Sequence, residues 1–137
     1  MPAACPLCAA PDAESVLWTD AHCRVMEAGD RDYPGYCRVI WNAHVREMSD
    51  LPDASRTHLL AVVVGVERVL RDLLHPDKIN LASLGNQAPH LHWHVIPRFA
   101  DDTHFPDSIW AARKRAAIPR PVDRAALVRE LLRNLPR

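Results

Sequence analysis

Short apolar stretches separated by turn residues fill the first third of the chain, and they predict β-strands. Residues 15–20 (SVLWTD) and 22–28 (HCRVMEA) predict two strands joined by a turn at Asp20–Ala21. The next residues, 29–35, are rich in Gly, Asp and Pro, which supply the geometry of a loop. Residues 36–42 (YCRVIWN), rich in β-branched and aromatic side chains, then predict a third strand.

A longer apolar pattern in the middle of the chain has the spacing of a helix. Its apolar residues recur along one helical face: Leu59, Val62, Val63, Val66, Val69, Leu70, Leu73 and Leu74. Asp50 or Asp53 can cap the start of this helix, because both carry a short side-chain acceptor. Pro52 is tolerated in the first turn, and Pro76 ends the helix.

Two further strands are predicted in the second half of the chain. They cover 78–84 (KINLASL) and 90–97 (HLHWHVIP) and are separated by the turn residues Gly85–Asn86. A long, partly ordered loop is expected at 100–119, and a last amphipathic helix at roughly 122–135. Strands joined by hairpin-length turns, with helices between and after them, predict an α+β fold with an antiparallel sheet.

Composition and charge narrow the class of protein. The chain has 137 residues, 48% of them hydrophobic and 25% charged, as expected for one globular domain. Lys and Arg together equal Asp and Glu at 17 each, so charge gives no support for binding a nucleic-acid polymer or a membrane. The start shows no signal-peptide pattern, and the longest apolar stretch, 59–66, is too short to span a bilayer. Four cysteines do not make a disulfide framework, which favours a reducing, cytoplasmic location.

Three histidines stand at alternate positions in the run PHLHWHVIPR, residues 89–98. Side chains on a strand alternate between its two faces, so His90, His92 and His94 are expected on one face. The residues between them are expected to point into the core. A solvated strand face that uses histidine as its polar residue is the simpler interpretation, but three in strict alternation disfavour it. Histidine can act as nucleophile, general acid or metal ligand near neutral pH, so we expect a functional site.

The run His-Leu-His-Trp-His-Val-Ile resembles the motif of the histidine triad (HIT) superfamily, in which three histidines alternate with apolar residues. The flanking segments INLASLGN, PRF and RVIWNAHVREMSDL are also similar to bacterial HIT-domain nucleotide hydrolases of the diadenosine tetraphosphate hydrolase type. Together these segments cover most of residues 5–98. The resemblance implies a single HIT-like domain over 1–137, with an N-terminal arm at 1–14 and a C-terminal helical tail at 106–137.

The resemblance implies a nucleotide hydrolase or nucleotidyl transferase that acts at an α-phosphate through a covalent nucleotidyl-histidine. In that family the middle histidine is the nucleophile, which is His92 here, and a neutral imidazole is a competent nucleophile at pH 7. His94 would contact the phosphate or pass a proton to the leaving group. Further substrate-binding positions carried over from the family are Asn80, Gly85, Asn86 and Gln87. Asn80 and Gly85 can equally be ordinary strand-end and turn residues.

The chain departs from the family pattern in three places. Gly35-Tyr36 stands where many members have Gly-His, so a fourth supporting histidine is missing. Gln87 replaces a Ser or Thr that often precedes the triad. The carboxylate that binds ribose has no clear counterpart, and Glu27 and Asp30 are the candidates. These differences keep the residues for nucleophilic attack at phosphorus, but they do not identify the substrate.

Cys5 and Cys8 form a CxxC motif, which alone is compatible with a redox pair, half of a zinc site or two buried residues. In zinc-containing HIT proteins such a motif is joined by two histidines. The equivalent positions here are His44 and His90, so the resemblance implies a structural zinc ion held by Cys5, Cys8, His44 and His90. All four positions would be filled by protein, which leaves none for a catalytic water.

Residues outside the histidine triad and the CxxC motif also receive sequence-based interpretations. Trp93 and Trp110 are interpreted as packing residues. Arg98 either contacts a distal phosphate or caps its strand, and His104, in the following loop, could approach the pocket. The family commonly forms homodimers through the long helix and the adjoining strand, so a homodimer is expected.

Two alternatives to a nucleotide hydrolase remain. One is a non-catalytic nucleotide- or partner-binding module with the same fold. The other is a metal-dependent hydrolase in which His90 and His92 hold a catalytic metal. The complete triad favours the enzyme over the first alternative. The second leaves the CxxC motif unexplained and lacks an evident carboxylate ligand.

Overall fold

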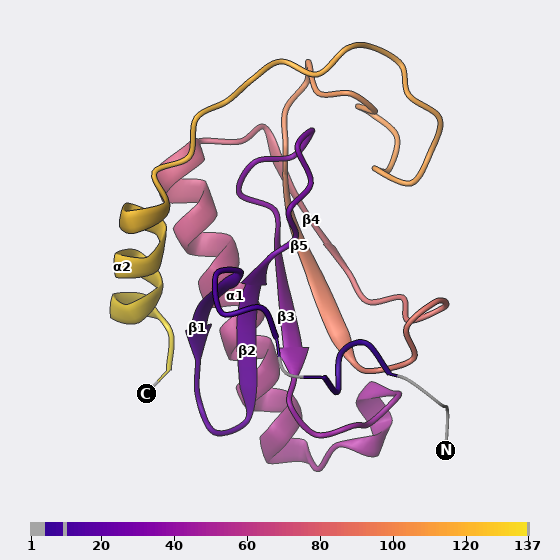
Figure 1. The fold of residues 1–137 in the computed structure, drawn as a ribbon, viewed down its shortest axis with the longest axis vertical. Helices are drawn as coiled ribbons and strands as arrows, with labels where there is room; N and C mark the ends of the chain where they lie inside the picture. Colours follow the sequence, from indigo (N-terminus) through magenta and orange to yellow (C-terminus); the bar gives the residue numbers. More distant parts are fainter. Residues whose placement is uncertain (1–4, 10, 137) are drawn as a thin grey trace.

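The computed structural model describes residues 5–9 and 11–136, which fold into a five-stranded antiparallel sheet and two α-helices (Figure 1). The strands lie in the spatial order β1-β2-β3-β5-β4, so β1 and β4 are the edges. The elements are β1 (Val16–Thr19), β2 (Cys23–Glu27), β3 (Cys37–Trp41), the 3₁₀ turn η1 (Met48–Asp50), α1 (Asp53–Leu74), β4 (Lys78–Ala82), β5 (His92–Arg98) and α2 (Arg124–Asn134). The predicted α+β fold is confirmed.

Each predicted strand is present within two residues of its expected ends, and the largest difference concerns the triad. β5 begins at His92 and not at His90. Leu91 donates its backbone N–H to Val45, beyond the end of β3, and accepts from Trp41. The chain at 90–91 therefore continues alongside the segment that follows β3, outside the regular ladder.

The start of α1 differs from the predicted caps. Pro52 occupies the N-cap position, and no side chain caps the first turn of the helix. Asp50 instead closes the preceding turn η1, where its carboxylate accepts the backbone N–H of Glu47. The helix ends at Leu74 as expected, and His75 follows it in the left-handed conformation with φ 49°.

The hydrophobic core lies between one face of the sheet and α1, and α2 packs against α1 and β1. Val25, Val39 and Val95 point from three adjacent strands into this core and are fully buried. Gly65 lets α1 approach the C-terminal segment closely, because a Cβ atom there would overlap a methyl carbon of Leu135. Covering one face in this way leaves the other face of the sheet for the triad.

The opposite face of β5 carries His92 and His94. Cross-strand register places Ile40 opposite His92, and Arg38 opposite His94 on one side with Ala82 on the other. Side chains directly opposite each other share a face of the sheet, so these residues form the floor of the triad region. In the described part of the chain, neither helix has the length and apolar character needed to cross a membrane.

Candidate active site

His92 and His94 lie side by side on β5, both nearly buried at 8% and 6% exposure. Their ring centroids are 4.9 Å apart and the rings are roughly perpendicular. The alternation of the strand puts both rings on the face away from α1, as the sequence predicted. Two imidazoles at this spacing can act on neighbouring atoms of one ligand.

The protonation pattern of His92 is set by a backbone carbonyl. Nδ1 of His92 lies 2.7 Å from the carbonyl oxygen of His90, and a carbonyl can only accept. Nδ1 therefore carries the proton and donates it, which leaves the Nε2 lone pair of the neutral ring available. The carbonyl of His92 itself accepts from the hydroxyl of Ser83 at 2.9 Å, which ties β5 to the segment after β4.

His94 is hydrogen-bonded to Tyr36, the residue that immediately precedes β3. The hydroxyl of Tyr36, itself buried, lies 2.5 Å from Nδ1 of His94. Burial lowers the pKa of His94 to about 4, helped by the neighbouring charges of His92 and Arg38, so this ring is neutral at pH 7. The sequence pattern suggested that a supporting histidine was lost at position 36. Tyr36 occupies that position and makes the hydrogen bond.

Arg38 and Trp110 also belong to this region, and sequence reasoning missed both. The guanidinium of Arg38 lies 5.7 Å from the centre of the Tyr36 ring, beside His94. Trp110, interpreted as a packing residue, is 52% exposed, with its ring edge-to-face against His94 at 5.1 Å. A charged residue inside the apolar strand CRVIW was the signal for Arg38. No local pattern pointed to Trp110.

The four predicted substrate-binding residues lie on β4 and on the segment that leads from it to β5. Asn80 is half-buried, and its Oδ1 accepts from Arg98 at 2.7 Å, which leaves its amide N–H groups to donate to a ligand. Gly85 has φ +76°, a conformation that favours glycine, and Asn86 and Gln87 are exposed. This segment returns the chain from Ala82, opposite His94, to His92, so it borders the histidine pair.

The two candidate ribose carboxylates line a hollow of about 360 Å³ that Tyr36 also borders. Glu27 is paired there with Arg124 at 3.3 Å. Asp30 accepts the backbone N–H of Asp32 at 2.9 Å within its loop. The sheet register places Glu27 opposite Cys37, on the face that α1 covers, whereas Asp30 lies in the loop that leads to Tyr36. Asp30 is not engaged in an ion pair within the described residues.

Arg98, predicted either to contact a distal phosphate or to cap its strand, is enclosed within the protein, which argues against the phosphate contact. It is 2% exposed, and its Nε and Nη2 donate to the two carboxylate oxygens of Asp102 at 2.8 and 3.0 Å. These bonds hold the pKa of Asp102 far below its usual range against the opposing effect of burial. A residue so enclosed cannot reach a distal phosphate.

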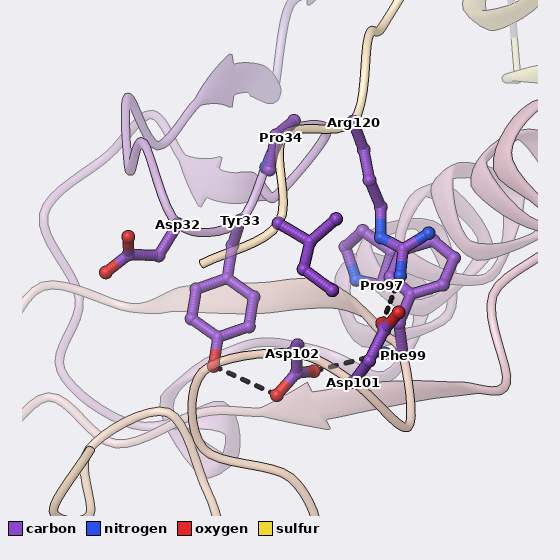
Figure 2. Close-up of a pocket in the computed structure, with 9 residues that line it drawn as sticks. Asp32, Tyr33, Pro34, Pro97, Phe99, Asp101, Asp102 and Arg120 are labelled. Atoms are coloured by element: carbon purple, nitrogen blue, oxygen red, sulfur yellow. Dashed lines mark hydrogen bonds and ion pairs between the residues drawn. The ribbon is translucent and has the colours of Figure 1, made fainter. Parts of the chain in front are cut away.

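His104 likewise lies in a buried cluster, where its ring stacks on that of Tyr33. Its Nδ1 lies 2.6 Å from the hydroxyl of Tyr33, which also bonds to Asp102 at 3.3 Å. Figure 2 shows Tyr33 and Asp102 pointing toward each other, with Arg120 lying over Phe99 nearby. This cluster anchors residues 99–119, called here the 99–119 loop, against the sheet.

Cys5, Cys8, His44 and His90 come together at the start of β5. One ligand atom from each lies within 4.8 Å of the others. Nδ1 of His44 is 3.2 Å from both Sγ of Cys8 and Nδ1 of His90. The four residues that the sequence grouped are therefore adjacent, and the arrangement can hold a metal ion.

The ring of His90 is oriented for such a role. Its Nε2 donates to the carbonyl oxygen of Trp41 at 2.6 Å, which leaves the lone pair of Nδ1 facing the two thiols. Burial lowers the pKa of His90, and a neutral imidazole is the form that binds metal. The other two cysteines, Cys23 and Cys37, are buried outside this cluster, and burial raises the pKa of each to about 12.

Residues 11–101 match the family model described as the HIT domain. The chain belongs to the HIT domain family. This match spans the sheet, α1, the whole triad and the residues immediately after β5.

Solved HIT structures agree with the fold. A histidine triad protein from Bradyrhizobium japonicum is 25% identical, with a TM-score of 0.70 over 89% of this chain and 92% of that one. A histidine triad protein from Marinobacter aquaeolei VT8 is 26% identical, with a TM-score of 0.73 over 89% and 93%. Because most of each chain is covered, the likeness extends beyond the triad itself.

Among curated proteins, an AP-4-A phosphorylase from Mycobacterium tuberculosis is 32% identical over 78 residues, or 53% of this HIT protein. The aligned region is 40% of that relative's length, so the chain spans less than half of it.

Proposed function

We propose that this HIT protein is a nucleotide hydrolase or nucleotidyl transferase acting at the α-phosphate of dinucleoside polyphosphates or nucleoside phosphoramidates. The observation that carries the proposal is the bond from His92 Nδ1 to the His90 carbonyl. In the neutral ring this bond leaves the Nε2 lone pair free and fixes the plane of the ring, so that form of His92 is a nucleophile that needs no separate base.

The proposed reaction has two steps. The Nε2 lone pair of His92 forms a bond to the α-phosphorus, and the bond from phosphorus to the leaving group breaks with its electron pair. An amine released from a phosphoramidate takes up a proton from the medium. Water then attacks the phosphorus, the P–N bond breaks, and the nucleotide and neutral His92 are released while the water proton passes to the medium. Each step displaces one ligand at phosphorus, so the two displacements restore the enzyme.

His94 would hold the phosphate between these steps. Burial raises the pKa of Tyr36, so its hydroxyl stays protonated and can donate to Nδ1 of His94. The proton of the neutral His94 ring then sits on Nε2, where it can donate to a non-bridging phosphate oxygen. The amide of Asn80 and the segment with Gly85, Asn86 and Gln87 would complete the phosphate site.

The test is to look for the covalent intermediate. Dinucleoside tetraphosphate labelled at the α-phosphate is mixed with protein and quenched, and acid-labile label on the protein is measured. Wild-type protein should carry label, and His92→Asn should carry none while keeping its circular dichroism spectrum. His22→Asn, which changes an exposed histidine away from the pair, is the control and should label like wild type.

Two further outcomes of this experiment are informative. Because the similar curated protein is named a phosphorylase, turnover is measured with and without inorganic phosphate to distinguish phosphate from water as acceptor. Nucleotide binding without label or turnover would identify a non-catalytic binding module. Loss of turnover on chelation, with recovery on adding metal and no adduct, would overturn the proposal in favour of a metal-dependent hydrolase.

We further propose that the cluster of Cys5, Cys8, His44 and His90 binds a structural zinc ion. Two thiols and two imidazoles are a donor set that zinc prefers, and the four groups already converge. A bound ion would join the N-terminal arm to His44 and to the start of β5. Thiolate ligands persist in a reducing compartment, which is in line with a cytoplasmic protein.

A homodimer is proposed through the β4 edge and the flank of α1. β4 is an edge strand, and Leu81 on it is 40% exposed, on the same face of the sheet as α1. Leu60 and Val64, one turn apart on α1, are also exposed, at 41% and 36%. Light scattering after size exclusion should give the mass of two chains, and Leu81→Arg should give that of one. A wild-type monomer at micromolar concentration would contradict the dimer.

A further inference from the structure

The 99–119 loop places a large aromatic side chain at the histidine pair, and the proposed chemistry does not use it. Trp110 is 52% exposed while its ring makes an edge-to-face contact with His94, centroid to centroid 5.1 Å. Exposed apolar surface of this size is unfavourable in water. The half-exposed indole of Trp110, next to the candidate phosphate-binding ring of His94, is therefore available to contact a ligand.

The position of Trp110 is fixed by its neighbour in sequence. Ile109 packs onto the small apolar cluster formed by Tyr33, Tyr36 and Ile96. With that cluster occupied by Ile109, Trp110 remains at the border of the histidine pair. The contact with His94 is thus a consequence of how the loop is seated on the sheet.

The loop backbone is also held in place at several points. The guanidinium of Arg115 donates to the carbonyl oxygens of Asp102 and Phe105, and the backbone N–H of Lys114 donates to Thr103. The buried ion pair between Asp102 and Arg98 fixes the base of the loop. Trp110 is therefore presented on an anchored segment, as a preorganised binding surface requires.

A positive charge beside His94 suits the same kind of ligand. Arg38 lies directly across from His94 in the sheet, and no ion pair within 4 Å joins it to a carboxylate of residues 5–9 or 11–136. A guanidinium binds phosphate oxygens, and an indole stacks on a planar base. An arginine and an indole that both neighbour one imidazole match an anion that carries an aromatic ring.

We propose that Trp110 is a stacking platform for a nucleobase of the substrate. The inference rests on the proposed function, since it takes the ligand at the histidine pair to be a nucleotide. The base can belong to the nucleotide that is transferred or to the leaving group. Stacking tolerates any base, so Trp110 would favour nucleotides over simple phosphates without selecting one base strongly.

The first test measures binding by calorimetry, with AMP and with ribose 5-phosphate, which lacks the base. Trp110→Ala should weaken AMP binding about 10-fold or more and leave ribose 5-phosphate unchanged, because only the base stacks. Trp110→Phe should restore most of the affinity. Ile118→Ala is the matched control, because Ile118 is 48% exposed on the same loop but lines the small cavity beside Phe99.

The second test compares the KM of two substrates. Adenosine 5′-phosphoramidate has a base only on the transferred half, whereas diadenosine tetraphosphate has one on each half. A KM raised by Trp110→Ala for both substrates assigns the transferred base, and a rise for the dinucleotide alone assigns the leaving base. Unchanged AMP affinity together with unchanged KM for both substrates would overturn the platform and leave the proposed function intact.

The proposed reaction can also fail while the stacking role of Trp110 holds. If wild-type protein forms no adduct and turns over neither substrate, but binds AMP in a way that Trp110→Ala weakens, the proposed reaction fails and the platform stands. If wild-type protein binds AMP no more tightly than ribose 5-phosphate and hydrolyses neither substrate, both are refuted.

Discussion

Two backbone carbonyls decide which ring nitrogen carries the proton in neutral His90 and neutral His92. The carbonyl of His90 accepts a hydrogen bond from Nδ1–H of His92, and the carbonyl of Trp41 accepts one from Nε2–H of His90. The two neighbouring rings are therefore held in opposite tautomers, one with a free Nε2 and the other with a free Nδ1. The same residue type thus serves as nucleophile at one position and as metal ligand at another.

The bond between Tyr36 and His94 leads to a prediction about rate. Tyr36→Phe should lower kcat about 10- to 100-fold with KM within about threefold, because His94 loses the donor that fixes its tautomer. Tyr36→His, which supplies another ring that can donate, should recover part of kcat. Steady-state kinetics with diadenosine tetraphosphate would measure both.

The chain offers a matched control for this prediction. Tyr33 makes a similar buried hydrogen bond, to His104 at 2.6 Å, away from the histidine pair. Tyr33→Phe should cost a similar amount of stability, about 1–3 kcal/mol by urea denaturation, with much less effect on kcat. Equal losses of kcat in the two variants would mean that Tyr36 matters for stability alone.

Individual residues differed in how far the sequence could place them. The faces of His92 and His94 followed from strand alternation, which is a local property. Trp110 and Arg98 could not be assigned locally, since their partners are His94 from another element and Asp102 from the following loop. The hydrogen bond from the Tyr36 hydroxyl could not be predicted either, because the family motif has a histidine at that position.

Secondary structure was predicted well where periodicity decided it. The strands and the long helix appeared within a few residues of their expected ends, because a buried face repeats along each one. The capping residue predicted for α1 was wrong because capping depends on local geometry, and the carboxylate of Asp50 closes the preceding turn η1 instead. The 99–119 loop has no periodicity, and its order comes from buried polar contacts.

The 99–119 loop is anchored by Asp102, which forms a buried ion pair with Arg98. Asp102→Asn should lower the free energy of unfolding by about 3–5 kcal/mol, because Arg98 would keep a buried charge without its partner. Asp101→Asn is the adjacent control. Its side chain is 52% exposed and paired with Arg120, so the loss should stay below about 1 kcal/mol. Equal losses in urea denaturation would show that the ion pair does not hold the loop.

Across the whole molecule, the proposed zinc site joins three distant segments of the chain. Cys5 and Cys8 come from the N-terminal arm, His44 follows β3, and His90 precedes β5. CxxC alone left several interpretations open, and only the family resemblance supplied the two histidines. The structure brings all four residues together, although 85 residues separate Cys5 from His90.

Metal content and thermal stability test this site together. Purified protein should hold about one zinc per chain by elemental analysis, and Cys8→Ser should hold much less. The variant and the chelated wild type should both melt at least about 5 °C lower, because binding energy at a structural site contributes to folding. Cys37→Ala, which removes a buried thiol outside the cluster, should keep its zinc. A folded, active wild type without metal would refute the site.

His90 has a consequence for genetic dissection of the protein. The ring of His90 faces the cysteines and its carbonyl accepts a hydrogen bond from His92. This one residue therefore affects both the metal site and the nucleophile. Substituting it would remove the metal ligand and disturb the local backbone at once, and the two phenotypes could not be separated. Cys8 and His92 each belong to only one of these systems. Alleles at those two positions, combined in one double mutant, are the pair from which the contributions of metal and nucleophile can be resolved.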